Sequence, residues 1–260
     1  MTHVGIVKAD TLVSIMNWFG LPLFFMYLMS MFFVPFLSGN WTHTQEIWDC
    51  WQTLNVGVLA FISSVIAFNI SRYNASKQRE RNFIAARAFL PNALSELTWY
   101  CKSSSILMLE AWSQLGDSIS QGSPLKTTFP DLPQSYKETF KHCISEADPE
   151  VASNLADILV KLQIHHSRLN ELKTSFEGNG GLIWDRQILT SYLFSLGHLQ
   201  ALINKLFGFS RGMEPFNDPS LIWDDYQNAY SNLAIDIEDV PDLEGFTKRY
   251  ISRRTNKTTD

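Results

Sequence analysis

Two apolar runs decide the fold: VSIMNWFGLPLFFMYLMSMFFVPFL at residues 13–37 and LNVGVLAFISSVIAFNI at residues 54–70. A helix of about 20 apolar residues crosses the roughly 30 Å hydrocarbon core of a bilayer. The first run is uncharged over its whole length and is too long for the apolar core of a cleaved signal peptide. We therefore predict transmembrane helices over 13–37 and 51–71, and we expect Pro22 to kink the first.

The second run carries small residues at helical spacing. Separations of three and four residues place five of them in one stripe: Gly57, Ala60, Ser64, Ala67 and Ser71. Such a stripe lets another membrane helix approach closely. Two partners are open, namely the first span of the same chain and the same stripe of a second copy.

Lysines and arginines are distributed unevenly around the two runs. Lys8 precedes the first run, residues 38–50 contain no Lys or Arg, and five basic residues follow the second run before residue 88. By the positive-inside rule, we expect a cytoplasmic N-terminal tail (1–12), a short external loop (38–50) and both termini in the cytoplasm. Four cations are expected to contact the anionic inner leaflet: Arg72, Lys77, Arg79 and Arg81.

The rest of the chain has the length of one domain. We assign residues 72–254 to a cytoplasmic α-helical domain and residues 255–260 to a polar tail. Within it, residues 88–247 contain 10 basic and 21 acidic residues. Because nucleic acids bind cationic surfaces, this balance argues against a nucleic-acid partner.

Apolar residues recur at helical spacing through most of this domain. We expect the second span to continue as a helix to about residue 115, with a bend at Pro91, and a loop over 116–133. Further helices are expected over 134–145, 148–176 and 185–207, and after Asp218-Pro219 and Val240-Pro241. The predicted fold is all-α, with two N-terminal transmembrane helices as a hairpin followed by a cytoplasmic α-helical bundle.

Three blocks carry a family resemblance: RNFIAARAFLPNALSELTWYC (81–101), ADPEVASNLADILVKLQIHHSRL (147–169) and DVPDLEGFTKRYISRR (239–254). In this order they resemble corresponding blocks of an uncharacterised family of bacterial membrane proteins, which have two N-terminal transmembrane helices and a helical cytoplasmic domain. The resemblance implies this architecture and a place in the bacterial inner (cytoplasmic) membrane. It implies no activity and no catalytic residue.

Two adjacent histidines form the candidate site of the domain. His165 lies in the apolar stripe of the helix expected over 148–176, and His166 borders that stripe. Adjacent helical residues diverge by about 100°, so the pair does not face one metal as an i, i+4 pair does. We expect both to pack or hydrogen-bond at a helix interface, with a pH-sensitive contact as the main alternative. His198 falls away from the apolar stripe of its own helix and is expected to be exposed.

Known catalytic patterns are missing from the sequence. There is no Walker loop, nucleotide fingerprint, nucleophile elbow or HExxH motif. Cys50 is expected outside and Cys101 and Cys143 inside, so the membrane would prevent Cys50 from pairing with either. We therefore expect no enzyme, no metal, no cofactor and no small-molecule substrate.

Two functional classes remain. The first is a membrane-anchored scaffold or interaction module at the inner face of the cytoplasmic membrane, whose partners are the lipid bilayer and a protein partner or a second copy. The alternative is a membrane-perturbing effector of bacterial stress or phage defence, activated by assembly of the cytoplasmic domain. The lack of a catalytic constellation favours the first.

Overall fold

The computed structural model describes residues 18–20, 22–39, 41–116, 124–177, 184–217 and 220–257. Within these ranges every regular element is helical, which confirms the all-α prediction. Tertiary contacts divide the chain into two units, residues 1–75 and residues 76–260. Each unit is described by itself.

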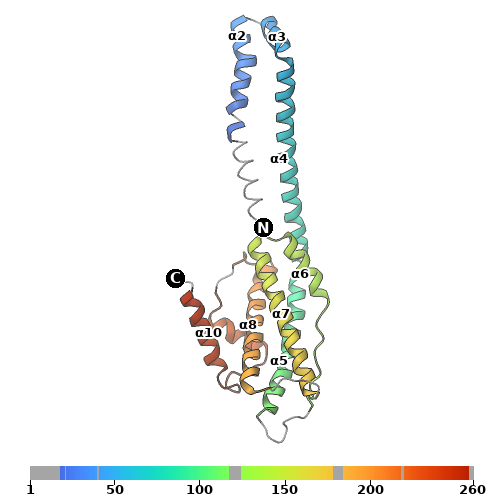
Figure 1. The fold of residues 1–260 in the computed structure, drawn as a ribbon, viewed down its shortest axis with the longest axis vertical. Helices are drawn as coiled ribbons and strands as arrows, with labels where there is room; N and C mark the ends of the chain where they lie inside the picture. Colours follow the sequence, from blue (N-terminus) through green and yellow to red (C-terminus); the bar gives the residue numbers. More distant parts are fainter. Residues whose placement is uncertain are drawn as a thin grey trace. The chain divides into compact units, whose positions relative to one another are not determined.

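The first unit is built from long apolar helices. Residues 18–20 and 22–28 are helical, and they lead into the π-helical turn η1 (Met29–Phe33) and the helix α2 (Val34–Gly39). α3 (Trp41–Cys50) and the first part of α4 (Gln52–Arg87) follow (Figure 1). Two stretches are long and apolar enough to cross a membrane: Trp18–Gly39 and a helix that starts at Gln52.

Of two expectations for this unit, the loop changes in detail and the kink is untested. The loop expected over 38–50 is helical from Trp41 to Cys50, because this segment contains neither Gly nor Pro and its last carbonyls accept hydrogen bonds as in a helix. The backbone N–H of Trp51 donates to the carbonyl of Ile47 at 3.0 Å. The kink expected at Pro22 adjoins residue 21, which lies outside the described residues, so that kink stays a prediction.

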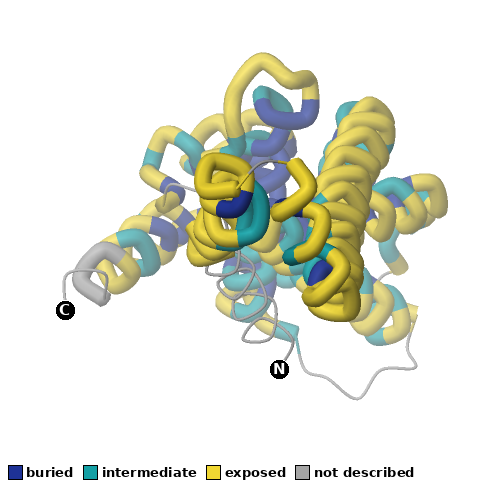
Figure 2. Tube along the Cα trace, turned by 90° about the horizontal axis from the view of Figure 1, so that it is seen from above, coloured by how far each residue is buried: buried dark blue, intermediate teal, exposed yellow. Residues whose placement is uncertain are grey.

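The second unit is a helical bundle organised around one central helix. Its helices are α5 (Leu90–Gln114), α6 (Ser135–Glu146), α7 (Pro149–Phe176), α8 (Arg186–Ser210), α9 (Trp223–Asn232) and α10 (Leu243–Lys257). α8 packs against α5, α7, α9 and α10, and α6 packs against α5 and α7. Buried segments lie among exposed outer turns (Figure 2). Because α8 is covered on several sides, it is buried over most of its circumference.

Local sequence signals explain where these helices begin. Asp148 precedes α7 in an extended conformation and Pro149 occupies its first turn, where a missing N–H costs nothing. The carboxylate of Asp185 caps α8 by accepting a hydrogen bond from the backbone N–H of Ile188 at 2.7 Å. These two predicted starts are confirmed.

Other boundaries differ from the sequence expectation. Instead of bending one continuous helix, Pro91 lies in the first turn of α5, after a two-residue break that follows α4. The helix expected after Val240-Pro241 is longer than predicted and reaches Lys257. Residues 117–123, 178–183 and 218–219, which include parts of the expected loops and the expected start at Asp218-Pro219, lie outside the described residues.

A close approach between α8 and α9 depends on a glycine. A Cβ added to Gly197 of α8 would lie 2.3 Å from Cε1 of Tyr230. The Tyr230 ring is fully buried in α9, and its hydroxyl is 2.8 Å from Oγ1 of Thr247 in α10. One edge of the ring lies against Gly197 and its hydroxyl is bonded to Thr247, so the buried ring cannot move aside at low cost.

We predict that Gly197→Ala lowers the free energy of unfolding by about 1–3 kcal/mol, because overpacking outweighs the gain in helix propensity. Gly208→Ala in the same helix is the matched control. A Cβ there meets only the end of the exposed Glu214 side chain, which can rotate away. Urea unfolding followed by circular dichroism should show the control unchanged or stabilised, and equal losses in both variants would contradict this packing.

Candidate functional site

The small-residue stripe lies on an exposed face of α4. All five of its members are exposed in the structure: Gly57, Ala60, Ser64, Ala67 and Ser71. A Cβ added to Gly57 meets no atom within 4 Å. The described part of the first unit therefore leaves this face uncovered.

A different face of α4 is turned toward the rest of the first unit. Its members are the partly or fully buried residues of α4 before residue 75: Asn55, Val58, Ile62, Val65 and Asn69. At about 100° per residue, the mean direction of this face is roughly 160° from that of the small-residue stripe. The sequence left two partners open for the stripe, and the described residues of the first span do not lie against it.

A hydrogen-bonded cluster at Asn55 joins the elements of the first unit. The Tyr27 hydroxyl donates to Oδ1 of Asn55 at 2.6 Å, and Nδ2 of Asn55 donates to the carbonyl of Trp48 at 3.4 Å. The indole N–H of Trp48 donates to the carbonyl of Met31 at 2.9 Å, inside the π-helical turn. Asn55 is 3% exposed. Sequence patterns do not identify this cluster, because Tyr27 is 28 residues from Asn55 in the chain.

The predicted leaflet-contacting cations have different surroundings. Arg79 donates to the carbonyls of Glu146, at 2.9 Å, and Ala147, at 2.6 Å. These carbonyls lie at the C-terminal end of α6, where a cation is favoured and helical partners are lacking. Lys77 forms an ion pair with Glu80 at 2.8 Å. Contact with lipid stays a prediction for all four residues, but Arg79 also has a structural role within the second unit.

The adjacent histidines lie where α7 packs near α5. His165 is 5% exposed, and its ring meets the Tyr100 ring edge to face with centroids 5.8 Å apart. Nδ1 of His166 is 3.0 Å from the Tyr100 hydroxyl. The expected packing and hydrogen bonding at a helix interface are thus present. Burial lowers the pKa of His165 to about 3, with smaller contributions from His166 and Arg168.

The prediction that His198 is exposed is wrong. It is 7% exposed, and its Nδ1 is 2.7 Å from the Tyr226 hydroxyl of α9. Its ring also stacks near Phe194 and meets Tyr250 of α10. A single apolar stripe underestimates burial in a helix that four others cover. Burial lowers the pKa of His198 to about 4, Lys161 and Arg254 lower it further, and Asp157 opposes them.

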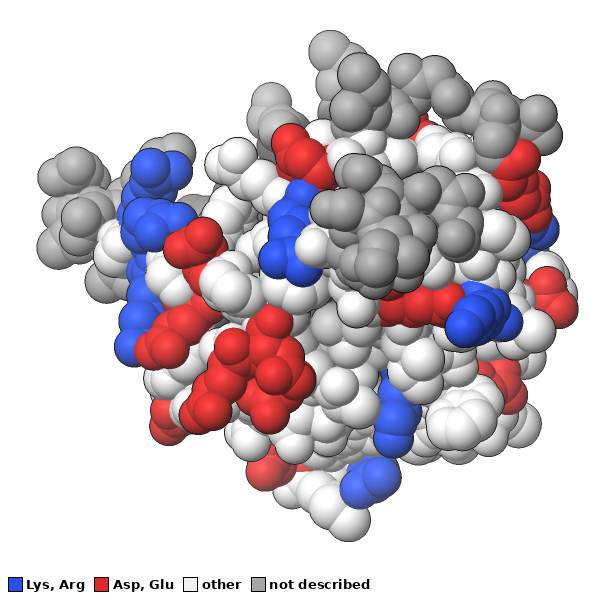
Figure 3. Space-filling view, turned by 90° about the horizontal axis from the view of Figure 1, so that it is seen from below, with Lys and Arg blue, Asp and Glu red and all other residues white. Residues whose placement is uncertain are grey.

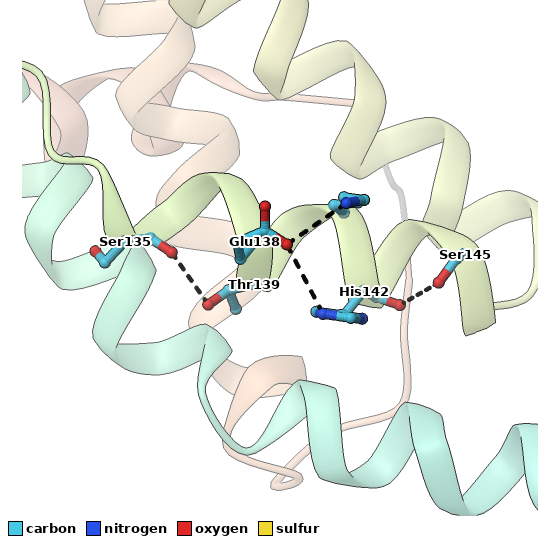
Figure 4. A network of polar contacts seen from close by, with 6 residues as sticks. Ser135, Glu138, Thr139, His142 and Ser145 are labelled. Atoms are coloured by element: carbon cyan, nitrogen blue, oxygen red, sulfur yellow. Dashed lines mark hydrogen bonds and ion pairs between the residues drawn. The ribbon is translucent and has the colours of Figure 1, made fainter.

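His142 is a contrasting exposed histidine. It lies on the outer face of α6, and its Nε2 is 3.8 Å from Glu138. Thr139 donates to the carbonyl of Ser135, and Ser145 donates to the carbonyl of His142 on the same helix (Figure 4). The contacts among these residues are local to α6, and the His142 side chain is 67% exposed.

The surface charge agrees with the acidic composition. Seen from below, several Asp and Glu side chains cluster together, while Lys and Arg side chains form a row along the left edge and occur singly elsewhere (Figure 3). Side chains of both charges therefore share this face of the second unit.

The cysteines differ in access. Cys50 is exposed, whereas Cys101 and Cys143 are buried. Burial raises the pKa of Cys101 to about 12 and that of Cys143 to about 11, so both remain thiols at neutral pH. Among the described residues, no group of three or more His, Cys, Asp and Glu side chains is arranged to hold a metal ion.

Comparisons of the chain with models of protein families, with curated proteins and with solved structures find no match. The family resemblance of the three sequence blocks therefore stays a prediction. Functional argument rests on the residues themselves.

Because two histidines are buried, we predict that the free energy of unfolding falls as the pH is lowered. Their pKa values lie below the ordinary value of 6.5, so the neutral rings contribute stability above pH 6.5 that is lost as the pH falls toward 4 for His198 and 3 for His165. Between pH 7 and pH 5 we expect a loss on the order of 2 kcal/mol for each histidine. In urea unfolding of the detergent-solubilised chain, His198→Gln should remove the part of the pH-dependent loss in unfolding free energy that His198 contributes.

His142→Gln is the matched control, because it makes the same change at a histidine whose side chain is 67% exposed. An identical pH dependence in the wild-type chain and in His198→Gln would contradict the assigned burial of a neutral imidazole.

Proposed function

We propose that this chain is a membrane-anchored helical interaction module at the inner face of the bacterial cytoplasmic membrane, and that copies associate through the small-residue stripe of α4. The proposal has four parts: the membrane anchor, its orientation, the face of α4 through which copies associate, and the helical domain that contacts other proteins. The observation that carries it is the exposure of the stripe on the face of α4 away from its intrachain contacts.

Exposed apolar surface supports the anchor. In each of the two apolar stretches, 6% of the most apolar window is buried, whereas the core helix of a soluble protein is mostly buried. Large apolar side chains at least half exposed occur along both stretches, including Phe25, Leu37, Leu59, Phe61 and Ile70. Continuous exposed apolar surface of this kind needs a non-aqueous environment. Lipid tails provide it.

Flanking residues support the orientation. Trp41 and Trp51 are about half exposed near the segment that joins the two stretches, which suits tryptophan at the outer membrane interface. Cations are absent from that segment and follow α4's apolar part, as in cytoplasmic flanks.

The stripe supports a second copy as the partner of α4. Small side chains allow close approach of helix backbones in lipid, where dispersion contacts and packing drive association. The intrachain face of α4 already uses Asn55, Val58 and Ile62, so the stripe remains accessible. A parallel arrangement of two copies would place identical stripes opposite each other.

The second unit supports a role in protein interaction. α5 carries Trp99, which is 70% exposed, and Ile106, two turns further along the same face, which is 47% exposed. Exposed large apolar side chains on one helix face are typical of protein contact sites.

We predict that Gly57→Leu and Ser64→Leu each weaken self-association of the full chain, raising the dissociation constant by about tenfold or more, which is about 1.4 kcal/mol. Leucine would hold the two helices apart without clashing inside one chain, since the Cβ position at Gly57 is open. Sedimentation in density-matched detergent, or energy transfer between labelled copies in lipid vesicles, measures the effect.

Ser63→Leu is the matched control, because Ser63 is an exposed serine of the same helix that lies outside the stripe. A monomeric wild-type chain, or equal weakening by Ser63→Leu and Ser64→Leu, would contradict the proposed face.

A further inference from the structure

A cavity in the second unit lies between α7, α8 and α10. Its volume is about 230 Å³, below the range of about 300–1,000 Å³ typical for drug-sized ligands. The residues that line it are Lys161, Ile164, His165, Arg168, Phe194, Ser195, His198 and Tyr250. Two of these are permanent cations and none is a carboxylate.

Arg168 is the strongest anion-binding group of this lining. Its guanidinium lies 4.5 Å from the centroid of the Tyr192 ring and donates to Oγ of Ser195 at 3.2 Å. Among the described residues, no carboxylate lies within ion-pair distance of it. A guanidinium has five N–H donors in a planar fork that matches a carboxylate. Arg168 therefore keeps donors for a ligand.

Lys161 adds a second cation. Its ammonium group is 2.7 Å from the Asp157 carboxylate, which holds the side chain in place but is not part of the cavity lining. An ammonium group has three donors, so one ion pair leaves capacity for another acceptor.

His165 points to a missing hydrogen-bond partner. The residue is 95% buried, lines the cavity, and its Nε2 has no partner within the described structure. An unsatisfied buried polar atom costs about 1–3 kcal/mol. A ligand atom that bonds to this nitrogen would recover that cost.

Apolar and aromatic side chains complete the lining of the cavity. Phe194 is 7% exposed and packs against Tyr250 and Phe246, with ring centroids 5.0 and 4.9 Å away. Ile164 lines the cavity from α7. His198 is fixed by its contact with the Tyr226 hydroxyl. The cavity thus combines cationic donors with an aromatic wall.

We propose that this cavity binds a small organic carboxylate, whose anionic end contacts Arg168 and Lys161 and whose apolar body lies against Phe194 and Ile164. The inference goes beyond the proposed membrane function and does not depend on self-association. A divalent metal is disfavoured, because two cations line the site and no carboxylate does. Inorganic phosphate would use the cations but leave the apolar wall without contact.

Radiolabelled benzoate is the probe, tested by equilibrium dialysis against the full chain in a non-ionic detergent. We expect saturable binding of one benzoate per chain, no binding of the neutral isostere benzamide, and little competition from inorganic phosphate. Absence of saturable binding at millimolar benzoate overturns the proposal. Equal binding of benzamide overturns its anionic part, and equal competition by phosphate overturns its apolar part.

Two matched pairs of variants locate the site. Arg168→Gln should weaken benzoate binding at least about tenfold, whereas Arg186→Gln should not, although Arg186 also lies over an aromatic ring, that of Trp112. Ile164→Trp should block the cavity and Val160→Trp should not. Both positions are about half exposed on α7, so folding should tolerate either change, and only Ile164 lines the cavity. Equal effects within either pair would overturn the assigned position.

Discussion

Apolar surface that cannot face water is the constraint on which the structure of the first unit depends. Helices carry Phe, Leu, Ile and Trp side chains outward through most of residues 18–70, and only a few positions turn inward. In water this arrangement would lose the hydrophobic free energy that normally folds a chain. In lipid the same side chains are in their preferred solvent, and the helical backbone satisfies its own hydrogen bonds. The proposed anchor and the proposed self-association both rest on that choice of solvent.

In the proposed membrane arrangement, the two faces of α4 differ in their side chains: one carries a hydrogen-bonded polar residue and the other carries small residues. Asn55 is buried and bonded to Tyr27 and Trp48, which gives the inward face specific contacts. Hydrogen bonds of this kind between membrane helices contribute of order 1 kcal/mol each and fix register. Small residues lie on nearly the opposite face, where their short side chains allow another helix backbone to approach closely. α4 therefore has one face in contact with its own chain and a second, exposed face, which we propose contacts another helix.

Sequence patterns predicted the parts of the structure that depend on local chemistry. The start of α7 follows from Pro149 after the extended Asp148, and the start of α8 follows from the capping carboxylate of Asp185. The burial of His165 follows from its place in an apolar stripe. Burial of His198, the bonds of Asn55 and the cavity depend on neighbours distant in sequence. His198 is covered because α9 and α10 fold over α8, and no periodicity within α8 contains that information.

Labelling of the native cysteine tests the central claim, which is that the chain crosses the membrane twice with residues 38–50 outside. Cys50 is the exposed cysteine of the native chain, and Tyr73 is 64% exposed beyond the second apolar stretch. A membrane-impermeant maleimide added to spheroplasts should label the wild-type chain, should not label Cys50→Ser, and should label Cys50→Ser with Tyr73→Cys only after permeabilisation. The claim would be contradicted if intact spheroplasts of the Cys50→Ser, Tyr73→Cys variant were labelled while Cys50 of the wild-type chain was not.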